Sequence, residues 1–208
     1  KDITHDWREG TYKNYFWMVP YNLRGLIDKI GGNEFAEKRL DTLFTRLDAK
    51  YEDDWFAAGN EPDFQVPWTY NWINKPNKTS QTISRILNEQ YNSSVSGLPG
   101  NDDLGTMGAW YVFASIGLYP MIPGVGGLSV NIPAFENISI NLSNNKILKI
   151  NKTGPKNFFI KSLSFNDEPH NSTWINWNKI SKGGVLSFET ANNNQSNWGI
   201  NESPPSFK

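Results

Sequence analysis

The spacing of apolar residues changes near residue 125, and this change limits the possible folds more than any other feature of the sequence. Before this point the apolar residues recur at helical intervals, most clearly at Ala36, Leu40, Leu43, Phe44 and Leu47. After it, short runs of β-branched and aromatic residues are separated by Asn, Gly and Pro. Helices followed by strands, rather than alternating with them, indicate the α+β class.

Four helices are predicted in the first part of the chain. Asn22 can cap a helix over residues 23–30, which the pair Gly31-Gly32 ends. Asn33 can cap a second helix, and a third begins around Thr79. The fourth runs over residues 103–116 and is apolar nearly all round, so we expect it to be an inner helix, buried on most sides.

Five strands are predicted in the second part, in the runs "LSVNI", "ISINL", "ILKI", "FFIKSLSF" and "GVLSFET". The segment "LSNNKI" indicates a hairpin turn, because Asn tolerates positive φ. The polar tail from Ala191 onward is expected to lie loosely on the surface.

These patterns divide the chain into a helical part (1–124), a β-sandwich-like segment (125–190) and a polar tail (191–208). A helix that is apolar on every side needs neighbours, and four or five helices do not obviously provide them. We therefore expect the helical part to be a portion of a larger helical barrel.

Charge and hydropathy argue against two classes of partner. The net charge is −1 and no run of basic residues occurs, so nucleic acid and anionic membranes are not expected partners. No apolar stretch reaches the roughly 18 residues that a membrane-spanning helix needs. The first ten residues, "KDITHDWREG", have no signal-like apolar core and are typical of the middle of a longer chain.

Metal chemistry is limited by the residue types present. The chain has no cysteine, which excludes disulfides and thiolate metal sites. Its two histidines, His5 and His170, are predicted to be surface residues without a role. A bound metal would have to be held by oxygen ligands, which favours calcium or magnesium.

Asn-X-Ser/Thr sequons are more frequent than chance predicts even for this asparagine-rich chain. If the source is a eukaryote, the excess favours a chain of the secretory pathway. The sequons begin at Asn77, Asn92, Asn137, Asn141, Asn151, Asn171, Asn194 and Asn201.

Three segments combine glycine, carboxylates and aromatic residues at predicted helix starts. They carry Glu9, Glu61 and the pair Asp102-Asp103. Hydrolysis of a glycosidic bond needs a protonated carboxyl group and, opposite it, an ionised carboxylate, and Glu9 and Asp103 are the natural candidates. The simpler interpretations are a surface acid for Glu9, a helix-start turn at Glu61, and acids that complement a helix dipole at Asp102 and Asp103.

Aromatic side chains near these segments have two interpretations as well. Tyr70, Trp72 and Trp110 can form a platform for a sugar, but aromatic residues more often fill cores, and we favour the core.

Together the three segments resemble glycoside hydrolase family 92, the exo-α-mannosidases. The matching stretches are "EGTYKNYFWMVPYNLRGLIDKIGG", "AGNEPDFQVPWTYNWI" and "GLPGNDDLGTMGAWYVFASIGLYPMIPG", and the strand-rich end is similar to the C-terminal β segment of that family. The resemblance implies helices from the C-terminal half of an (α/α)6 barrel, followed by the β segment. It also implies a calcium-dependent inverting enzyme, active only with its N-terminal β-sandwich and first barrel helices, that cleaves terminal α-linked mannose from secreted or extracellular glycans.

The resemblance also implies roles for individual residues. Glu9 matches the general acid and Asp103 the general base, while Asn101 replaces a second aspartate of some members and can only orient the water. Asn60 and Glu61 match the segment that contacts the sugar on the leaving-group side, and Asp102 is grouped with them as a substrate-binding residue. Glu61 and Asp103 are assigned to the neighbourhood of the calcium ion.

The chain departs from the family at several positions, and alternatives stay open. Thr11 to Tyr15 replace a frequent Asn-Ala-Trp-Gln-Tyr run, and Asp63-Phe64-Gln65 replace Ser-His-His. Asn60 stands where some α-1,2-cleaving members have histidine, which leaves the linkage open. The alternative functions are a non-catalytic carbohydrate-binding module and another inverting (α/α)6 glycoside hydrolase.

Overall fold

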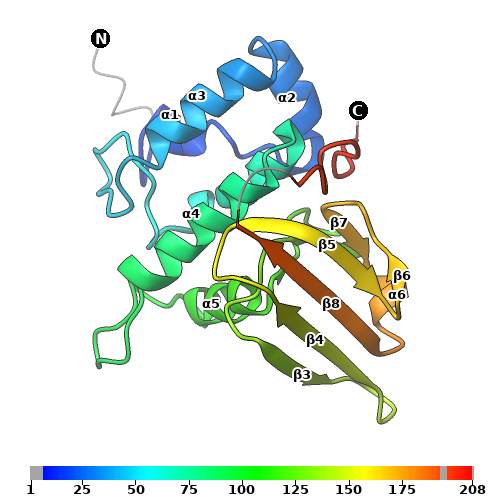
Figure 1. Ribbon diagram of the computed structural model, residues 1–208. Coiled ribbons are helices and arrows are strands. Elements are labelled where there is room, and N and C mark those ends of the chain that lie inside the picture. Colours follow the sequence, from blue (N-terminus) through cyan, green and yellow to red (C-terminus); the bar gives the residue numbers. More distant parts are fainter. Residues whose placement is uncertain (1–6, 193–195, 208) are drawn as a thin grey trace.

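The computed structural model describes residues 7–192 and 196–207 (Figure 1). His5 and the sequon at Asn194 lie outside the described residues. The fold is α+β, with most of the helices on one side of the molecule and the two sheets on the other. We call residues 7–117 the helical region and residues 118–191 the strand region.

The helical region contains five α-helices and three 3-10 helices among its described residues. The α-helices are α1 (Tyr12–Tyr15), α2 (Leu23–Lys29), α3 (Asn33–Leu43), α4 (Pro76–Glu89) and α5 (Thr106–Ile116). The 3-10 helices are η2 (Pro20–Asn22), η3 (Glu61–Asp63) and η4 (Val66–Ile73).

The predicted helices are present, with shifted starts. Asn22 caps α2 as expected, because its side chain accepts a hydrogen bond from the amide of Gly25 at 3.0 Å. The N-cap of α3 is Gly32 rather than Asn33, since glycine readily adopts its φ of 87°. Helix α4 begins three residues before Thr79, at Pro76, where the missing amide hydrogen of proline costs nothing.

Helix α5 differs most from its prediction. It begins at Thr106 instead of residue 103, and it is buried on only one side. Met107, Trp110 and Ala114 face the core, whereas Tyr111 and Val112 are 39% and 56% exposed. The described residues therefore do not supply the neighbours that an inner helix needs.

The strand region contains eight strands among the described residues, in two sheets. Strands β1 (Leu118–Tyr119), β2 (Gly127–Val130) and β7 (Trp174–Asn176) form the first sheet, in the order β1-β2-β7. Strands β3 (Asn137–Asn141), β4 (Ile147–Thr153), β5 (Phe159–Phe165), β6 (Glu168–Pro169) and β8 (Gly184–Ala191) form the second, in the order β3-β4-β8-β5-β6. A short helix, α6 (Trp177–Ile180), follows β7.

All five predicted strands are confirmed, and the pairing of the second sheet is mixed. The turn between β3 and β4 places Asn144 and Asn145 at φ 60° and 58°, as the hairpin prediction requires. Strand β8 lies between β4 and β5 and pairs parallel with β4 but antiparallel with β5. Strands β1, β6 and β7 were not predicted, because two or three residues are too few for a periodic pattern.

Two apolar clusters form the core. One lies mainly in the helical region but includes Met121, Ile122 and Trp174, and the other lies mainly in the strand region. Polar contacts also join the regions. Asn71 of η4 donates hydrogen bonds to Ser129 and to the carbonyl of Val130, at 2.8 and 3.0 Å. The indole of Trp68 donates to Asn131 at 3.1 Å. Because these groups are buried, their hydrogen bonds fix the position of the strand region against the helical region.

The C-terminal tail corrects two expectations of the sequence analysis. It does not lie loosely: Trp198 is 6% exposed, and Ser206 binds the amide of Arg24 and the indole of Trp72 at 3.1 Å each. His170 is half-buried rather than a surface residue, and its Nε2 lies 3.1 Å from the carbonyl oxygen of Trp174. The indole of Trp198 donates to the His170 carbonyl, which ties the tail to the strand region.

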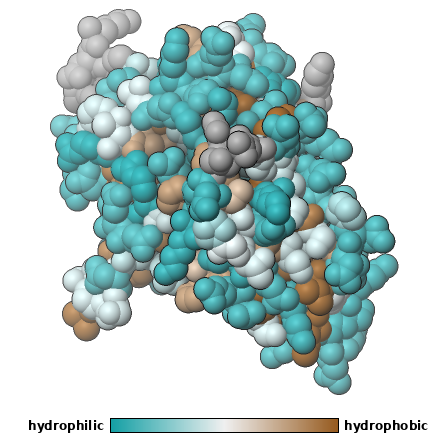
Figure 2. Space-filling view, viewed as in Figure 1, coloured by the Kyte–Doolittle hydropathy of each residue, from teal (hydrophilic) through white to brown (hydrophobic). Residues whose placement is uncertain are grey.

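The visible face of the molecule is mostly hydrophilic, with an apolar tip on the loop after α4 (Figure 2). Val95 in this loop is fully exposed. None of the helices in the described ranges is both long enough and apolar enough to cross a membrane.

Candidate active site

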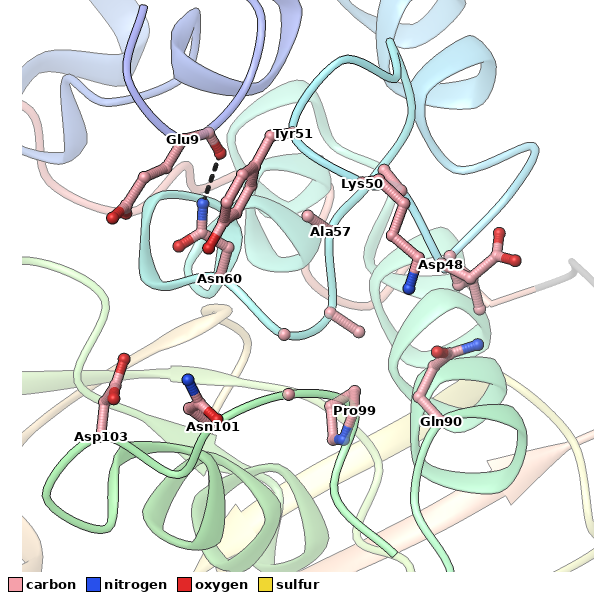
Figure 3. Close-up of a pocket in the computed structure, with 15 residues that line it drawn as sticks. Glu9, Asp48, Lys50, Tyr51, Ala57, Asn60, Gln90, Pro99, Asn101 and Asp103 are labelled. Atoms are coloured by element: carbon pink, nitrogen blue, oxygen red, sulfur yellow. Dashed lines mark hydrogen bonds between the residues drawn. The ribbon is translucent and has the colours of Figure 1, made fainter. Parts of the chain in front are cut away.

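A pocket of about 460 Å³ lies in the helical region, between the loops that precede α1, η3 and α5 (Figure 3). Glu9 reaches it from the upper wall in this view, and Asp103 and Asn101 reach it from the lower wall. Its lining is completed by residues 47–51, 57–60 and 99–100 and by Gln90.

The upper wall is held by side-chain hydrogen bonds to the backbone. The amide group of Asn60 donates to the carbonyl oxygen of Glu9 at 2.7 Å, which joins the two segments that carry predicted site residues. Thr11 and Asn14 form a capping box at the start of α1. The exposed side chain of Glu9 thus projects from a backbone that is fixed on both sides.

The lower wall owes its shape to an unusual turn. Asp103 and Leu104 have φ of 38° and 61°, in the left-handed region that residues other than glycine and asparagine rarely adopt. Thr106 donates through its amide and its hydroxyl to the carbonyl of Asp103, and Asp102 accepts the amide of Gly108 at 3.0 Å. Asp102 therefore binds an amide in the first turn of α5, while Asp103 on the same turn lines the pocket.

Two glycines bring the walls of the pocket together. A Cβ on Gly59 would lie 2.7 Å from the carbonyl oxygen of Pro99, and a Cβ on Gly100 would lie 2.9 Å from that of Gly59. No side chain fits at such distances, so only glycine allows these two backbones to approach so closely.

A buried carboxylate lies beneath the upper wall. Asp63 is 1% exposed, and its Oδ2 accepts hydrogen bonds from the amide of Ala57 at 2.8 Å and from the side chain of Asn14 at 3.2 Å. Burial raises the pKa of Asp63 to about 7, and the hydrogen bonds from Ala57 and Asn14 oppose this rise. Its Oδ1 has no hydrogen-bond partner among the described residues.

The groups at the pocket suit polar chemistry. Carboxylates of Glu9, Asp48 and Asp103, the ammonium group of Lys50 and three side-chain amides line it. Two carboxylates on opposite walls are the arrangement that acid–base hydrolysis of a glycosidic bond requires.

Four of the six predicted site residues line this one pocket: Glu9, Asn60, Asn101 and Asp103. Glu61 and Asp102 are not among the lining residues, and their substrate-binding roles stay predictions. Tyr70, Trp72 and Trp110 are at most 2% exposed and belong to the core, as the more conservative interpretation expected.

The other end of the pocket was not predicted from the sequence. It is formed by Asp48, Lys50, Tyr51 and Gln90. Residues 48–51 lie in a loop without a periodic pattern, and Gln90 follows the last turn of α4. A tyrosine and a run of three acids after Lys50 are too common on protein surfaces to have indicated a pocket.

The next feature is the set of side chains that could hold a metal ion. The described ranges contain no group of three or more His, Cys, Asp or Glu side chains that could hold a metal. Glu61 and Asp103, the residues assigned to calcium, do not share the lining of the pocket. The described residues alone therefore do not form a calcium cage of carboxylates.

Comparisons with known proteins give this pocket its context. The glycosyl hydrolase family 92 catalytic domain matches residues 1–192. An uncharacterized secreted glycosidase of Arthroderma benhamiae is 29% identical over 97% of this chain, which corresponds to 26% of the relative.

Solved structures of family GH92 mannosidases are also similar to this chain. The family GH92 alpha-mannosidase BT3965 of Bacteroides thetaiotaomicron is 31% identical and superposes with a TM-score of 0.88 over 99% of this chain and 28% of that one. The family GH92 inverting mannosidase BT2199 of the same organism shares the fold, with 24% identity and a TM-score of 0.85 over 96% of this chain and 30% of that one. The chain thus spans between a quarter and a third of the length of these relatives. With its matched segments and its fold, the chain belongs to glycoside hydrolase family 92.

Proposed function

We propose that this chain is part of an inverting exo-α-mannosidase that removes terminal α-linked mannose from glycans. The observation that carries the proposal is the position of Glu9 and Asp103 on opposite walls of one pocket, in a chain of family 92. The name of BT3965 as an alpha-mannosidase supports mannose as the sugar.

In the proposed reaction Glu9 is the general acid and donates its proton to the oxygen of the departing alcohol. Asp103 is the general base and takes a proton from the attacking water on the opposite face of the sugar ring. An inverting pair leaves room for that water, with the two carboxyl groups roughly 6.5–9.5 Å apart in general. Asn101, which lines the same wall as Asp103, orients the water through its amide.

Asn60 is proposed to contact the substrate on the leaving-group side. Its amide group donates to the carbonyl of Glu9, so the same side chain sets the distance between the acid and the leaving group. Glu61 and Asp102 are proposed to contribute to substrate binding from the neighbouring turns.

We also propose calcium dependence, with Glu61 and Asp103 in the neighbourhood of the ion. Calcium would help to bind and distort the sugar. Because the described residues form no carboxylate cage, further ligands would be amide and backbone oxygens and groups elsewhere in the full-length protein. Treatment with EDTA is expected to abolish turnover, and added calcium is expected to restore it.

The full-length protein is proposed to need its remaining segments for turnover, because this chain spans 26–28% of the relatives BT3965 and the Arthroderma glycosidase. The exposed face of α5, with Tyr111 and Val112, is a surface on which those segments would pack. A secreted or extracellular location is proposed from the secreted fungal relative and from the sequons. Seven sequon asparagines among the described residues are at least partly exposed, which supports glycosylation: Asn77, Asn92, Asn137, Asn141, Asn151, Asn171 and Asn201.

The test is turnover of α-mannosides by the full-length protein, with ¹H NMR to record the anomer that forms first. We expect β-mannose as the first product of an α-mannoside. Tight glycan binding without turnover would identify a carbohydrate-binding module instead, and preferred cleavage of gluco-configured substrates would identify another inverting hydrolase.

A further inference from the structure

The general acid needs a defined direction, and its own side chain does not provide it. Glu9 is exposed in this chain, so the direction of its carboxyl group depends on how the backbone around it is held. Two anchors hold that backbone. Asn60 binds the carbonyl of Glu9 at 2.7 Å, and the side chain of Asn14 accepts the amide of Thr11 at 2.8 Å.

The contact between Asn14 and this backbone is tight. The Thr11 hydroxyl donates to the same oxygen of Asn14 at 3.1 Å. A Cβ on Gly10 would lie only 3.0 Å from that oxygen, so the residue next to Glu9 packs directly on the Asn14 amide. Asn14 is 3% exposed, and water does not compete for these bonds.

Asp63 connects this anchor to the opposite segment. Its Oδ2 accepts from Asn14 at 3.2 Å and from the amide of Ala57 at 2.8 Å, and Ala57 lines the pocket. The backbone amide of Asp63 donates to the carbonyl of Asn60 at 3.1 Å. The backbone from Glu9 to Thr11 and these hydrogen bonds thus form a closed circuit, which continues through Asn14, Asp63 and Asn60 and returns to the carbonyl of Glu9.

We propose that Asn14 and Asp63 are positioning residues, which fix the Glu9 segment against the Asn60 segment and so aim the Glu9 carboxyl group at the leaving-group oxygen. This inference rests on the proposed function, since it takes Glu9 as the general acid. Neither residue touches the substrate in this arrangement, because neither lines the pocket.

A residue that positions a general acid has a distinctive kinetic effect. Proton donation matters for a poor leaving group such as a sugar, and it matters little for a phenol that departs as a stable anion. A residue that only stabilises the fold lowers the amount of active protein and so affects both substrates equally. The ratio of the two rates is therefore independent of the folded fraction.

The experiment measures kcat and KM of the full-length protein on an α-linked mannobiose and on 2,4-dinitrophenyl α-mannoside. We expect Asp63→Ala to lower kcat on the mannobiose by about tenfold or more and to change kcat on the dinitrophenyl mannoside by less than about threefold. Asp63→Asn keeps an acceptor oxygen for Ala57 and Asn14, and we expect it to restore most of the lost rate. Asn14→Ala is expected to give the same ratio of the two rates as Asp63→Ala.

Asn71→Ala is the matched control. Asn71 is also a fully buried amide with three hydrogen bonds, but it joins η4 to β2 and does not line the pocket. We expect it to destabilise the protein and to leave the ratio of the two rates at the wild-type value.

The outcomes separate this inference from the proposed function. Equal losses on both substrates for Asp63→Ala and Asn14→Ala, or no loss on either, would overturn the positioning role while the mannosidase activity stands. If the wild-type protein hydrolyses neither mannoside, the proposed function fails, and this inference fails with it. If Asp63→Ala does not fold, the ratio measured for Asn14→Ala decides in the same way.

Discussion

The helical region and the strand region bury different kinds of groups. In the helical region the buried set includes a carboxylate, Asp63, which binds the backbone amide of Ala57 in an irregular segment. It also includes Asn14, which binds the amide of Thr11, and Asn71, which binds the carbonyl of Val130 in β2. In the strand region the buried polar side chains among the described residues are all uncharged, and Ile150, Leu186 and Phe188 are at most 2% exposed in its apolar core. These polar residues are Ser129, Asn131, Thr173 and Thr190.

The difference follows from how each region satisfies its backbone. A sheet pairs its own amides and carbonyls, so its interior side chains need only be apolar. The loops around the pocket cannot do this, and buried side chains must supply the missing partners. The helical region is therefore built to hold a particular geometry, and the strand region is built for stability. The following predictions test this division of roles.

The largest effect is expected from the two opposed carboxylates. Glu9→Gln and Asp103→Asn in the full-length protein should each lower kcat by about two to four orders of magnitude, because each removes a proton-transfer group and keeps its shape. The unfolding midpoint in urea should not change. As a control in the strand region, Glu189→Gln alters an exposed ion pair with Lys161 and a hydrogen bond from Ser162, and it should leave kcat unchanged. A stable variant with normal kcat would contradict the role assigned to its carboxylate.

Substitutions in the core of the strand region should have the opposite result, which is a lower stability with an unchanged kcat. Ile150 is fully buried, and Ile150→Ala should lower the free energy of unfolding by about 2–5 kcal/mol, measured by urea denaturation. The kcat of the remaining folded protein should not change. Ile147, on the same strand, is 45% exposed, and Ile147→Ala should cost less than about 1 kcal/mol. A large loss of kcat with Ile150→Ala would show that the two regions are coupled.

A substitution at the glycine contact between the pocket walls is predicted to lower both the stability and kcat. Gly100→Ala places a methyl group 2.9 Å from the carbonyl of Gly59, so we expect a loss of about 1–3 kcal/mol in stability together with a lower kcat. Gly126→Ala is the matched control, because a Cβ there meets no atom within 4 Å. Full activity of Gly100→Ala would mean that the separation of the walls is not critical.

The smallest effect concerns pH and the strand region. Burial lowers the pKa of His170, and the charge of Lys179 lowers it further. The unfolded chain then takes up this proton at a higher pH than the folded chain does, so the contribution of His170 to stability is full above about pH 6.5 and is lost below it. The buried Asp63, whose pKa is raised to about 7, has the opposite effect and stabilises the folded chain as the pH falls from 7 to 5. The contribution of His170 is therefore measured as a difference: relative to wild type, His170→Asn should raise the urea midpoint at pH 5 compared with that at pH 7. Lys179→Gln should produce part of this change, and a pH dependence identical to that of wild type in both variants would exclude a contribution of His170.

The sequence predicted the strand region more fully than the helical region. Alternation of side chains is a local property, so the five longer strands and the Asn144-Asn145 turn were visible in the pattern. The insertion of β8 between β4 and β5 was not predictable, because it depends on the pairing of β8 with β4, whose residues lie more than 30 positions earlier in the chain.

In the helical region the sequence predicted the residues but not their conformation. Glu9, Asn60, Asn101 and Asp103 were selected from three separate loops and line one pocket. The positive φ of Asp103, a residue that lines the pocket, cannot be predicted from an Asp-Asp-Leu run. The 3-10 helix η4 was also missed, since all eight of its residues are buried and show no amphipathic period.

The central place of β8 in its sheet has a consequence for the order of events during biosynthesis. Strands β4 and β5 leave the ribosome before β8 does, yet each needs β8 as its neighbour. Until residue 191 has been synthesised, one edge of each strand remains open to pairing with other chains. At about 5–20 residues per second the interval is only a few seconds, but it is the period in which a nascent chain would most depend on chaperones.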